Sequence, residues 1–148
     1  MDDILADCAE GCVWSQLDMT DSFFHTWVHP DGIHLMAVTT PFGLYEWTTM
    51  PQGLENAPPI HRHHMNAALH PLIGKICHIY IDDMLIWSDM VVEHVKHINM
   101  VMKLLIAACL FCNQKKCNFF LTEMDFLGHH ISTQLKELNQ INWKSRKF

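Results

Sequence analysis

Basic residues are scarce in the first two-thirds of this sequence. Only Arg62 and Lys75 precede residue 96, and the other eight of the ten Lys and Arg residues lie from Lys96 onward. The sixteen Asp and Glu residues outnumber them and set the formal net charge at −6. A strong non-specific grip on nucleic acid usually needs a basic surface. The composition excludes such a grip over most of the chain and leaves any electrostatic hold on phosphates to the C-terminal third.

Long apolar runs and a targeting signal are also missing. The sequence has no run of 18 apolar residues, so no segment is suited to span a membrane. The first residues, Met1 to Ile4, are acidic and lack the basic-then-apolar order of a signal peptide. We expect an intracellular protein, in the cytoplasm or the nucleus, that does not contact membrane and whose six cysteines are reduced.

The length and composition of the sequence are typical of one globular domain. The 148 residues are 49% apolar and 18% charged, which suffices for one hydrophobic core. The residue patterns predict these elements in chain order: a helix over 1–11, a strand over 13–19 ending near Asp18, a helical turn near 21–24, extended runs over 26–28, 35–40 and 44–49, a helix over 56–69, a hairpin over 76–88, a helix over 91–109, and late strands over 119–121 and 126–131. This order predicts an α+β fold, with a meander of short strands and with helices on one face of a mostly antiparallel sheet.

The two longest predicted helices have identifiable apolar positions. Asn56 is the candidate cap of the first. Its apolar stripe, a weak one, is expected to comprise Ile60, His64, Ala67, Ala68 and Leu69. The second has a cleaner stripe at helical spacing, comprising Val91, Val95, Ile98, Met102, Leu105 and Cys109.

A pair of adjacent aspartates interrupts the predicted hairpin. Runs of Ile, Tyr, Leu and Trp flank Asp82 and Asp83, which we expect to form its turn. Two neighbouring carboxylates repel each other unless a cation lies between them. A hard divalent ion such as Mg²⁺ would remove that repulsion, although an acidic turn in solvent is the commoner structure for an isolated Asp-Asp pair.

Five sequence blocks together resemble a known family. They are Leu17-Asp18-Met19, Thr39 to Trp47, Met50 to Pro58, Tyr80-Ile81-Asp82-Asp83, and Phe126 to Ser132. In this order and spacing the chain resembles the palm of a reverse transcriptase, specifically that of a Ty3/gypsy-type long-terminal-repeat retrotransposon polyprotein. The likeness runs from about Ile4 to Ser132. We expect residues 1–132 to form this palm and residues 133–148 to be a disordered polar tail.

The resemblance implies a set of catalytic residues. Asp18, Asp82 and Asp83 match the palm carboxylates that hold two Mg²⁺ ions, for which Mn²⁺ is a substitute, and the carbonyl of Met19 would be a further ligand. Lys116 is similar to a lysine that acts on the leaving group. The implied activity is RNA-directed DNA polymerisation with an RNA or DNA template-primer and deoxynucleoside triphosphates.

The same resemblance assigns substrate contacts. Phe23 matches an aromatic that crowds the sugar and rejects a 2′-hydroxyl, and Gln52 and Gly53 match a loop that packs on the nascent base pair. The strand pair over 126–131 matches the one that grips the primer. For Phe23 and the strand pair, ordinary packing is an equally simple explanation, and for Lys116 a surface charge is simpler.

Departures from the family pattern favour a second interpretation. Pro59, His61 and Leu35 replace residues that are usual in the family, and the flanking fingers and thumb are not in this sequence. We expect a truncated, retrotransposon-derived reverse transcriptase palm. The alternative is a non-catalytic remnant, or a co-opted module that binds nucleic acid or a protein partner. The sequence sets neither its activity nor its oligomeric state.

A zinc site is a further alternative. Cys109 and Cys112 have zinc-like spacing, Cys117 follows, and His129 or His130 could supply the fourth ligand. Against it, Cys109 falls on the apolar stripe and is expected to be buried. The neighbouring histidines at 61, 63 and 64 are expected to form a solvated helix face rather than a metal cluster.

Overall fold

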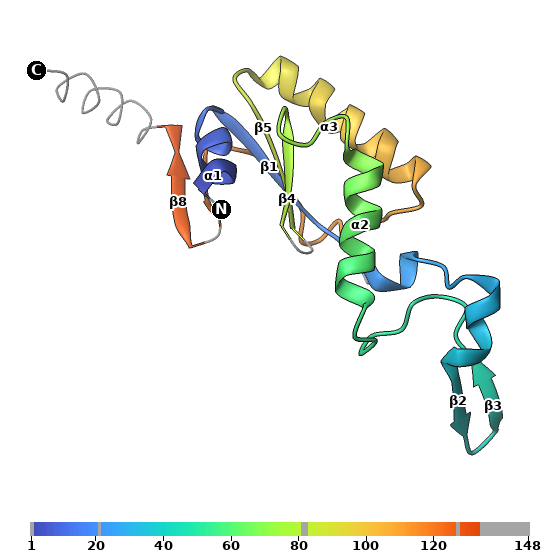
Figure 1. Cartoon of the computed structure of the whole chain (residues 1–148). Coiled ribbons are helices and arrows are strands. Elements are labelled where there is room, and N and C mark those ends of the chain that lie inside the picture. The colour runs from blue at the N-terminus through green and yellow to red at the C-terminus, as the bar shows by residue number, and fades with distance from the viewer. Residues whose placement is uncertain (1, 21, 81–82, 127, 134–148) are drawn as a thin grey trace, which may run out of the picture.

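A four-stranded antiparallel sheet forms the centre of the molecule (Figure 1). The computed structural model describes residues 2–20, 22–80, 83–126 and 128–133. Its elements, in chain order, are α1 (Asp2–Ala9), β1 (Val13–Asp18), the 3₁₀ helices η1 (Ser22–His25) and η2 (Pro30–Met36), β2 (Ala37–Thr40), β3 (Gly43–Glu46), α2 (Ala57–Leu69), β4 (Cys77–Tyr80), β5 (Asp83–Ser88), α3 (Val91–Ala107), β6 (Asn118–Leu121), β7 (Glu123–Phe126) and β8 (His129–Ser132). The sheet has the strand order β4-β5-β1-β6. The predicted α+β class is confirmed.

The two longer helices, α2 and α3, cover one face of this sheet. Met84 and Ile86 of β5 point to this face and are fully buried against both helices, together with Leu17 of β1. Met65 of α2 and Leu105 of α3 pack on them from the other side. This layer is the larger of the two buried cores, and it positions the ends of β1 and β5.

The opposite face is covered by α1 and by the hairpin β7–β8. Successive residues of a strand point to opposite faces, so Leu85 and Trp87 of β5 pack here with Trp14 of β1. Cys8 of α1 and Phe126 of β7 complete the contact. The chain therefore buries both sheet faces, with the long helices on the face opposite α1.

The short strands β2 and β3 form a separate two-stranded sheet rather than part of a larger meander. Figure 1 shows this hairpin projecting beyond α2, away from the main sheet. The extended run predicted from Leu35 begins later, because residues Pro30–Met36 form a 3₁₀ helix. Pro30 opens that helix, where a fixed φ and a missing N–H are tolerated.

The buried face of α2 is not the one expected from its apolar residues. Ala57, His61, Met65 and Leu69 are buried at a spacing of four, whereas Ile60 is 44% exposed. The expected stripe was right for Leu69 but wrong for Ile60, because it followed residue type while packing placed a histidine in the core. The expected exposure of His61 was likewise wrong. Asn56 precedes the helix but makes no side-chain capping hydrogen bond.

The buried face of α3 is also rotated from the expected stripe. The expected positions Ile98, Met102 and Leu105 do pack on the core. His94 and Val101 are buried beside them, whereas Val91 and Val95 are exposed. His94 is buried because polar partners surround its ring: Ser15 Oγ lies 2.7 Å from its Nε2 and Ser88 Oγ lies 2.8 Å from its Nδ1. The polar partners come from two strands, which sequence periodicity does not reveal.

Two further expectations concern membrane-spanning segments and the C-terminal tail. Within the described residues, no helix combines the length and the hydrophobicity that a membrane crossing demands. The tail expected to be disordered falls on residues 134–148, which lie outside the described residues. The proposed boundary of the palm at residue 132 therefore stays a prediction.

Candidate active site

Asp18 and Asp83 are paired residues at the ends of neighbouring strands. In the antiparallel register of β1 and β5, the Cα of Asp18 is opposite that of Asp83, and the next pair is Leu17 with Met84. Directly opposed side chains of an antiparallel pair have Cβ atoms about 4.5–5.5 Å apart. The sequence prediction that strand β1 ends near Asp18 is confirmed.

Strand alternation places both carboxylates on one face. Asp83 has the same parity along β5 as Leu85 and Trp87, and Asp18 has the same parity along β1 as Trp14. Those apolar residues belong to the core under α1 and β7–β8. The two aspartates thus point to the face opposite α2 and α3, and the Asp18 side chain keeps 22% of its surface exposed.

The turn of the hairpin differs from the expected one. Tyr80 pairs with Asp83, so the connection consists of residues 81 and 82, and Asp83 is the first residue of β5. The expectation that Asp82 and Asp83 together form the turn was therefore wrong for Asp83. Asp82 itself lies outside the described residues.

Residues 111–117, the second part of the connection between α3 and β6, support the end of β1. The Asn113 backbone N–H donates to the Asp18 carbonyl at 2.8 Å. Lys116 of the same connection places its Nζ 3.6 Å from Asp18 Oδ1. The connection therefore fixes both the backbone of Asp18 and the charge beside its carboxylate. Sequence reasoning selected Lys116 but missed Asn113, whose contribution is a backbone group with no sequence signal.

Met19 continues from Asp18 into a buried position. Its side chain is 5% exposed, and its backbone forms an isolated antiparallel bridge with Cys112. The Cys112 thiol donates to Met19 Sδ at 3.8 Å. This residue is thus held on the same connection that supports Asp18.

The residues predicted to contact substrate lie around α2. Phe23 is half-buried in η1, with its ring edge-on to that of His61 at a centroid separation of 5.4 Å. Gln52 and Gly53 are exposed in the turn that precedes α2. Gly53 has a φ of +91°, a conformation that favours glycine. Phe23 is linked to α2 by this ring contact.

The cysteines do not form a metal cluster. Cys109 is exposed, contrary to its expected burial, and follows the end of α3 with a φ of +55°. Cys117 lies beside Asp18, with its thiol 4.0 Å from the Asp18 carbonyl oxygen. Among the described residues, no group of three His, Cys, Asp or Glu side chains could hold a metal ion. Because that part of the chain omits Asp82, the finding bears on the zinc alternative and not on the three aspartates.

An antiparallel sheet with two opposed carboxylates at its open end and two helices behind it is the architecture of a polymerase palm. Residues 2–131 match the family described as reverse transcriptase (RNA-dependent DNA polymerase). The chain belongs to this family, which confirms the resemblance inferred from its sequence blocks. As a class, reverse transcriptases depend on divalent metal ions.

Relatives of known sequence include retrotransposon polyproteins. The chain is 34% identical over 145 residues to the retrovirus-related Pol polyprotein from transposon 297 of Drosophila melanogaster, covering 98% of this chain and 14% of the relative. It is 32% identical over 129 residues to the corresponding polyprotein from transposon gypsy of the same species, covering 87% of this chain and 12% of the relative. The chain thus spans about one-seventh of the length of these relatives.

Solved structures agree on the fold. A foamy viral protease-reverse transcriptase in complex with double-stranded DNA superposes with a TM-score of 0.73 at 26% identity, over 82% of this chain and 23% of that chain. The same kind of protein in complex with an RNA/DNA hybrid gives a TM-score of 0.72 at 25% identity, over 87% of this chain and 18% of that chain. The chain has the fold of a reverse transcriptase palm.

Proposed function

We propose that this chain is a catalytic palm that carries out RNA-directed DNA polymerisation by two-metal nucleotidyl transfer. The observation that carries the proposal is the direct opposition of Asp18 and Asp83 at the ends of β1 and β5. Membership of the reverse transcriptase family supports the reaction class. The substrates would be a deoxynucleoside triphosphate and an RNA or DNA template-primer. The similar foamy viral proteins bind double-stranded DNA and an RNA/DNA hybrid, which supports the second of these substrates.

The three aspartates would hold two Mg²⁺ ions, or Mn²⁺ in their place. Two opposed carboxylates on one sheet face supply hard oxygen ligands from separate strands, which suits Mg²⁺. Asp82, next to Asp83 in sequence, would add the third carboxylate, and the Met19 carbonyl a further oxygen. The ions would activate the primer 3′-hydroxyl and stabilise the pyrophosphate that leaves.

Lys116 would act beside the same ions. Its ammonium is 64% exposed and lies 3.6 Å from the Asp18 carboxylate, which leaves it free to turn toward an incoming phosphate. A cation there would stabilise the charge that develops on the leaving pyrophosphate. The 111–117 connection would therefore contribute to catalysis as well as to the support of β1.

Substrate selection would fall to residues around α2. The Phe23 ring, held against His61, would limit the space at the sugar and reject a 2′-hydroxyl. Gln52 and Gly53 would pack on the nascent base pair from the exposed turn before α2. The hairpin β7–β8 would hold the primer strand.

The test is Mg²⁺-dependent primer extension by the purified chain on an RNA template. The doubly substituted Asp82→Asn/Asp83→Asn protein should show no extension. Asp89→Asn is the matched control, because Asp89 is an exposed aspartate just beyond the other end of β5. Extension by the parent and by the control, but not by the double variant, would support the proposal.

The alternative is a module that binds nucleic acid or a protein partner without catalysis. A parent protein that circular dichroism shows to be folded, but that extends no primer with Mg²⁺ or Mn²⁺, would favour this alternative. Binding of a labelled RNA/DNA hybrid by the same sample would then show whether this non-catalytic protein binds nucleic acid.

A further inference from the structure

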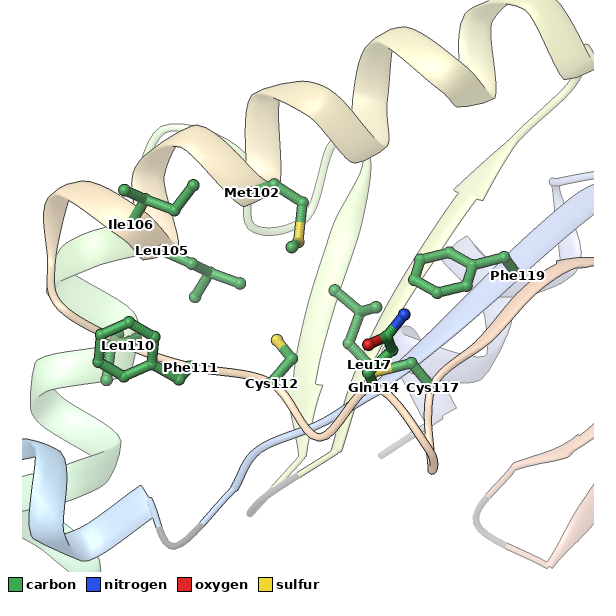
Figure 2. Close-up of a pocket in the computed structure, with 10 residues that line it drawn as sticks. All are labelled: Leu17, Met102, Leu105, Ile106, Leu110, Phe111, Cys112, Gln114, Cys117 and Phe119. Carbon is green, nitrogen blue, oxygen red and sulfur yellow. The ribbon is translucent and has the colours of Figure 1, made fainter.

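A cavity of about 410 Å³ lies between α3 and the 111–117 connection, on the helix-covered side of the sheet (Figure 2). Its floor is Leu17, the residue before Asp18, and its inner wall includes Leu105 and Leu110, all of which are almost fully buried. Ile106, Phe111 and Phe119 are exposed around its edge. It is separated from the face of the sheet to which Asp18 and Asp83 point.

The cavity is lined by uncharged groups. Gln114 supplies an amide and Cys112 and Cys117 supply thiols, while the other described lining residues are hydrocarbon or thioether. Figure 2 shows the sulfur atoms of Cys112 and Met102 directed into the same space. A charged ligand would lose its hydration here without gaining a counter-charge.

The size of the cavity indicates the size of its ligand. An apolar cavity of about 150 Å³ accommodates benzene, and drug-sized ligands occupy pockets of about 300–1,000 Å³. This cavity therefore suits a molecule of two or three rings rather than a single ring. A concave space with buried leucines at its base and an open edge favours such a molecule over a flat protein surface.

We propose that this cavity is a binding site for a small, uncharged, mainly aromatic molecule with one hydrogen-bonding group, and that its occupancy acts on Asp18 through the 111–117 connection. Gln114 would supply the hydrogen bond. The effect on Asp18, unlike the binding, rests on the proposed catalytic function.

The coupling follows from contacts that the connection makes in two directions. Cys112 and Cys117 line the cavity, and their thiols also contact Met19 Sδ and the Asp18 carbonyl oxygen. Asn113 and Lys116, between those cysteines, bind the backbone and the carboxylate of Asp18. A ligand that pushes the connection away from α3 would shift these partners, and a displacement of about 1 Å can slow an enzyme by roughly a hundredfold.

The binding test uses the whole chain labelled with ¹³C at the methionine methyl groups. 4-Hydroxybiphenyl is the probe, and the similarly shaped but charged biphenyl-4-carboxylate is its control. The Met102 methyl signal, assigned with Met102→Leu, should shift in a saturable way, with a dissociation constant of about 0.1–1 mM for a ligand of this size. The carboxylate should bind at least roughly tenfold more weakly.

Two variants of α3 localise the binding. Ile106→Trp fills the edge of the cavity from an exposed position and should weaken binding by at least about tenfold. Val92→Trp adds the same ring at a position on α3 that is 70% exposed and does not line the cavity, so binding should be unchanged. Equal binding to both variants, or no saturable shift in the folded parent, would overturn the proposal.

Primer extension tests the coupling separately. The probe should slow extension by the parent and by Val92→Trp, but not by Ile106→Trp. Binding without any effect on extension would overturn the coupling, whereas a parent that extends no primer would contradict the proposed function and leave the binding result standing. Self-association that buries the cavity would also overturn the assignment, and sedimentation velocity would detect it as a concentration-dependent rate that Ile106→Trp abolishes.

Discussion

Asp18 of β1 and Asp83 of β5 face each other across one antiparallel strand pair, both on the sheet face opposite the long helices. Like charges directly opposed on a sheet destabilise the pair. The exposed Lys116 ammonium, 3.6 Å from Asp18 Oδ1, offsets part of this repulsion, and a metal ion between the two carboxylates would offset more of it. This gives the proposed metal site a thermodynamic signature that does not depend on catalysis.

Asp83→Asn should stabilise the metal-free protein. Removing one of the two opposed charges is expected to raise the free energy of unfolding by roughly 0.2–1 kcal/mol in EDTA. Adding Mg²⁺ should raise the melting temperature of the parent more than that of the variant, because ligand binding stabilises the folded state. Circular dichroism melts with EDTA and with Mg²⁺ measure both effects, with Asp89→Asn as control. A variant that melts well below the parent in EDTA would contradict the repulsion argument.

Lys116→Gln should reduce activity while leaving stability nearly unchanged. The side chain is 64% exposed, so its ion pair with Asp18 adds at most about 1 kcal/mol to stability. Loss of a group that assists the leaving pyrophosphate should lower the single-turnover extension rate by roughly a hundredfold. Lys115→Gln, the exposed neighbour in sequence, is the matched control. Equal rates for the two variants would show that Lys116 is an ordinary surface charge.

His94 should make the fold sensitive to mild acid. Its pKa is lowered to about 4, chiefly by burial and then by the nearby His97. The unfolded chain therefore takes up a proton near pH 6.5 that the folded chain refuses, and stability falls as the pH drops from about 6.5 toward 4. Between pH 7 and pH 5 the loss from this residue should be roughly 2 kcal/mol.

His94→Gln tests this assignment. Glutamine keeps hydrogen-bonding groups for Ser15 and Ser88 but has no proton to gain, so the difference in stability between pH 7 and pH 5 should shrink. Urea unfolding at both pH values measures this difference, and the exposed His63→Gln serves as control. An unaltered pH dependence in His94→Gln would assign the acid sensitivity to other groups.

Gly11→Ala should destabilise the protein because there is no room for a methyl group. A Cβ at this position would lie 2.9 Å from Trp87 Cβ, an atom fixed to the backbone that cannot swing aside. The overpacking should cost about 1–3 kcal/mol. At Gly32 the nearest atom would be Val28 Cγ1 at 3.5 Å, so Gly32→Ala should change stability by less than about 0.5 kcal/mol. The midpoints of urea unfolding for the two variants measure this difference in stability, and equal midpoints would contradict the packing argument.

The strands of the main hairpin, strand β1 and the two long helices could be predicted from sequence because their signals are local, whereas the run over 126–131 was predicted from its residue pattern as one strand and is divided between β7 and β8. Runs of β-branched and aromatic residues marked β1 and the β4–β5 hairpin, and the block containing Asp18 had a recognisable family spacing. The opposition of Asp18 to Asp83 needed the structure, since it depends on the register of two strands far apart in the chain.

The helix faces could be predicted only in part: Leu69 and Leu105 are buried as expected, but residue type was a poor guide to the burial of the histidines. His61 is buried against Phe23, and His94 is buried because hydroxyl groups from β1 and β5 satisfy its ring. Phe23 and Ser15 lie far from these histidines in the sequence, and Ser88, six residues before His94, belongs to a strand and not to the helix. The support that Asn113 gives to Asp18 was missed for a related reason, since a backbone N–H has no residue signature.

The position of β1 inside the sheet has a consequence for biosynthesis. This strand is made early, but its neighbours β5 and β6 are translated much later, and the Asn113 contact to Asp18 comes from the connection just before β6. Both edges of β1 therefore stay unpaired during translation until those segments emerge from the ribosome. Strand pairing that forms late between distant segments slows folding, and the unpaired strand edges can aggregate before the pairing is complete. A nascent chain that stalled before β6 would carry Asp18 on a strand with an unpaired edge, so the proposed catalytic site is assembled only when the last strand of the main sheet has been made.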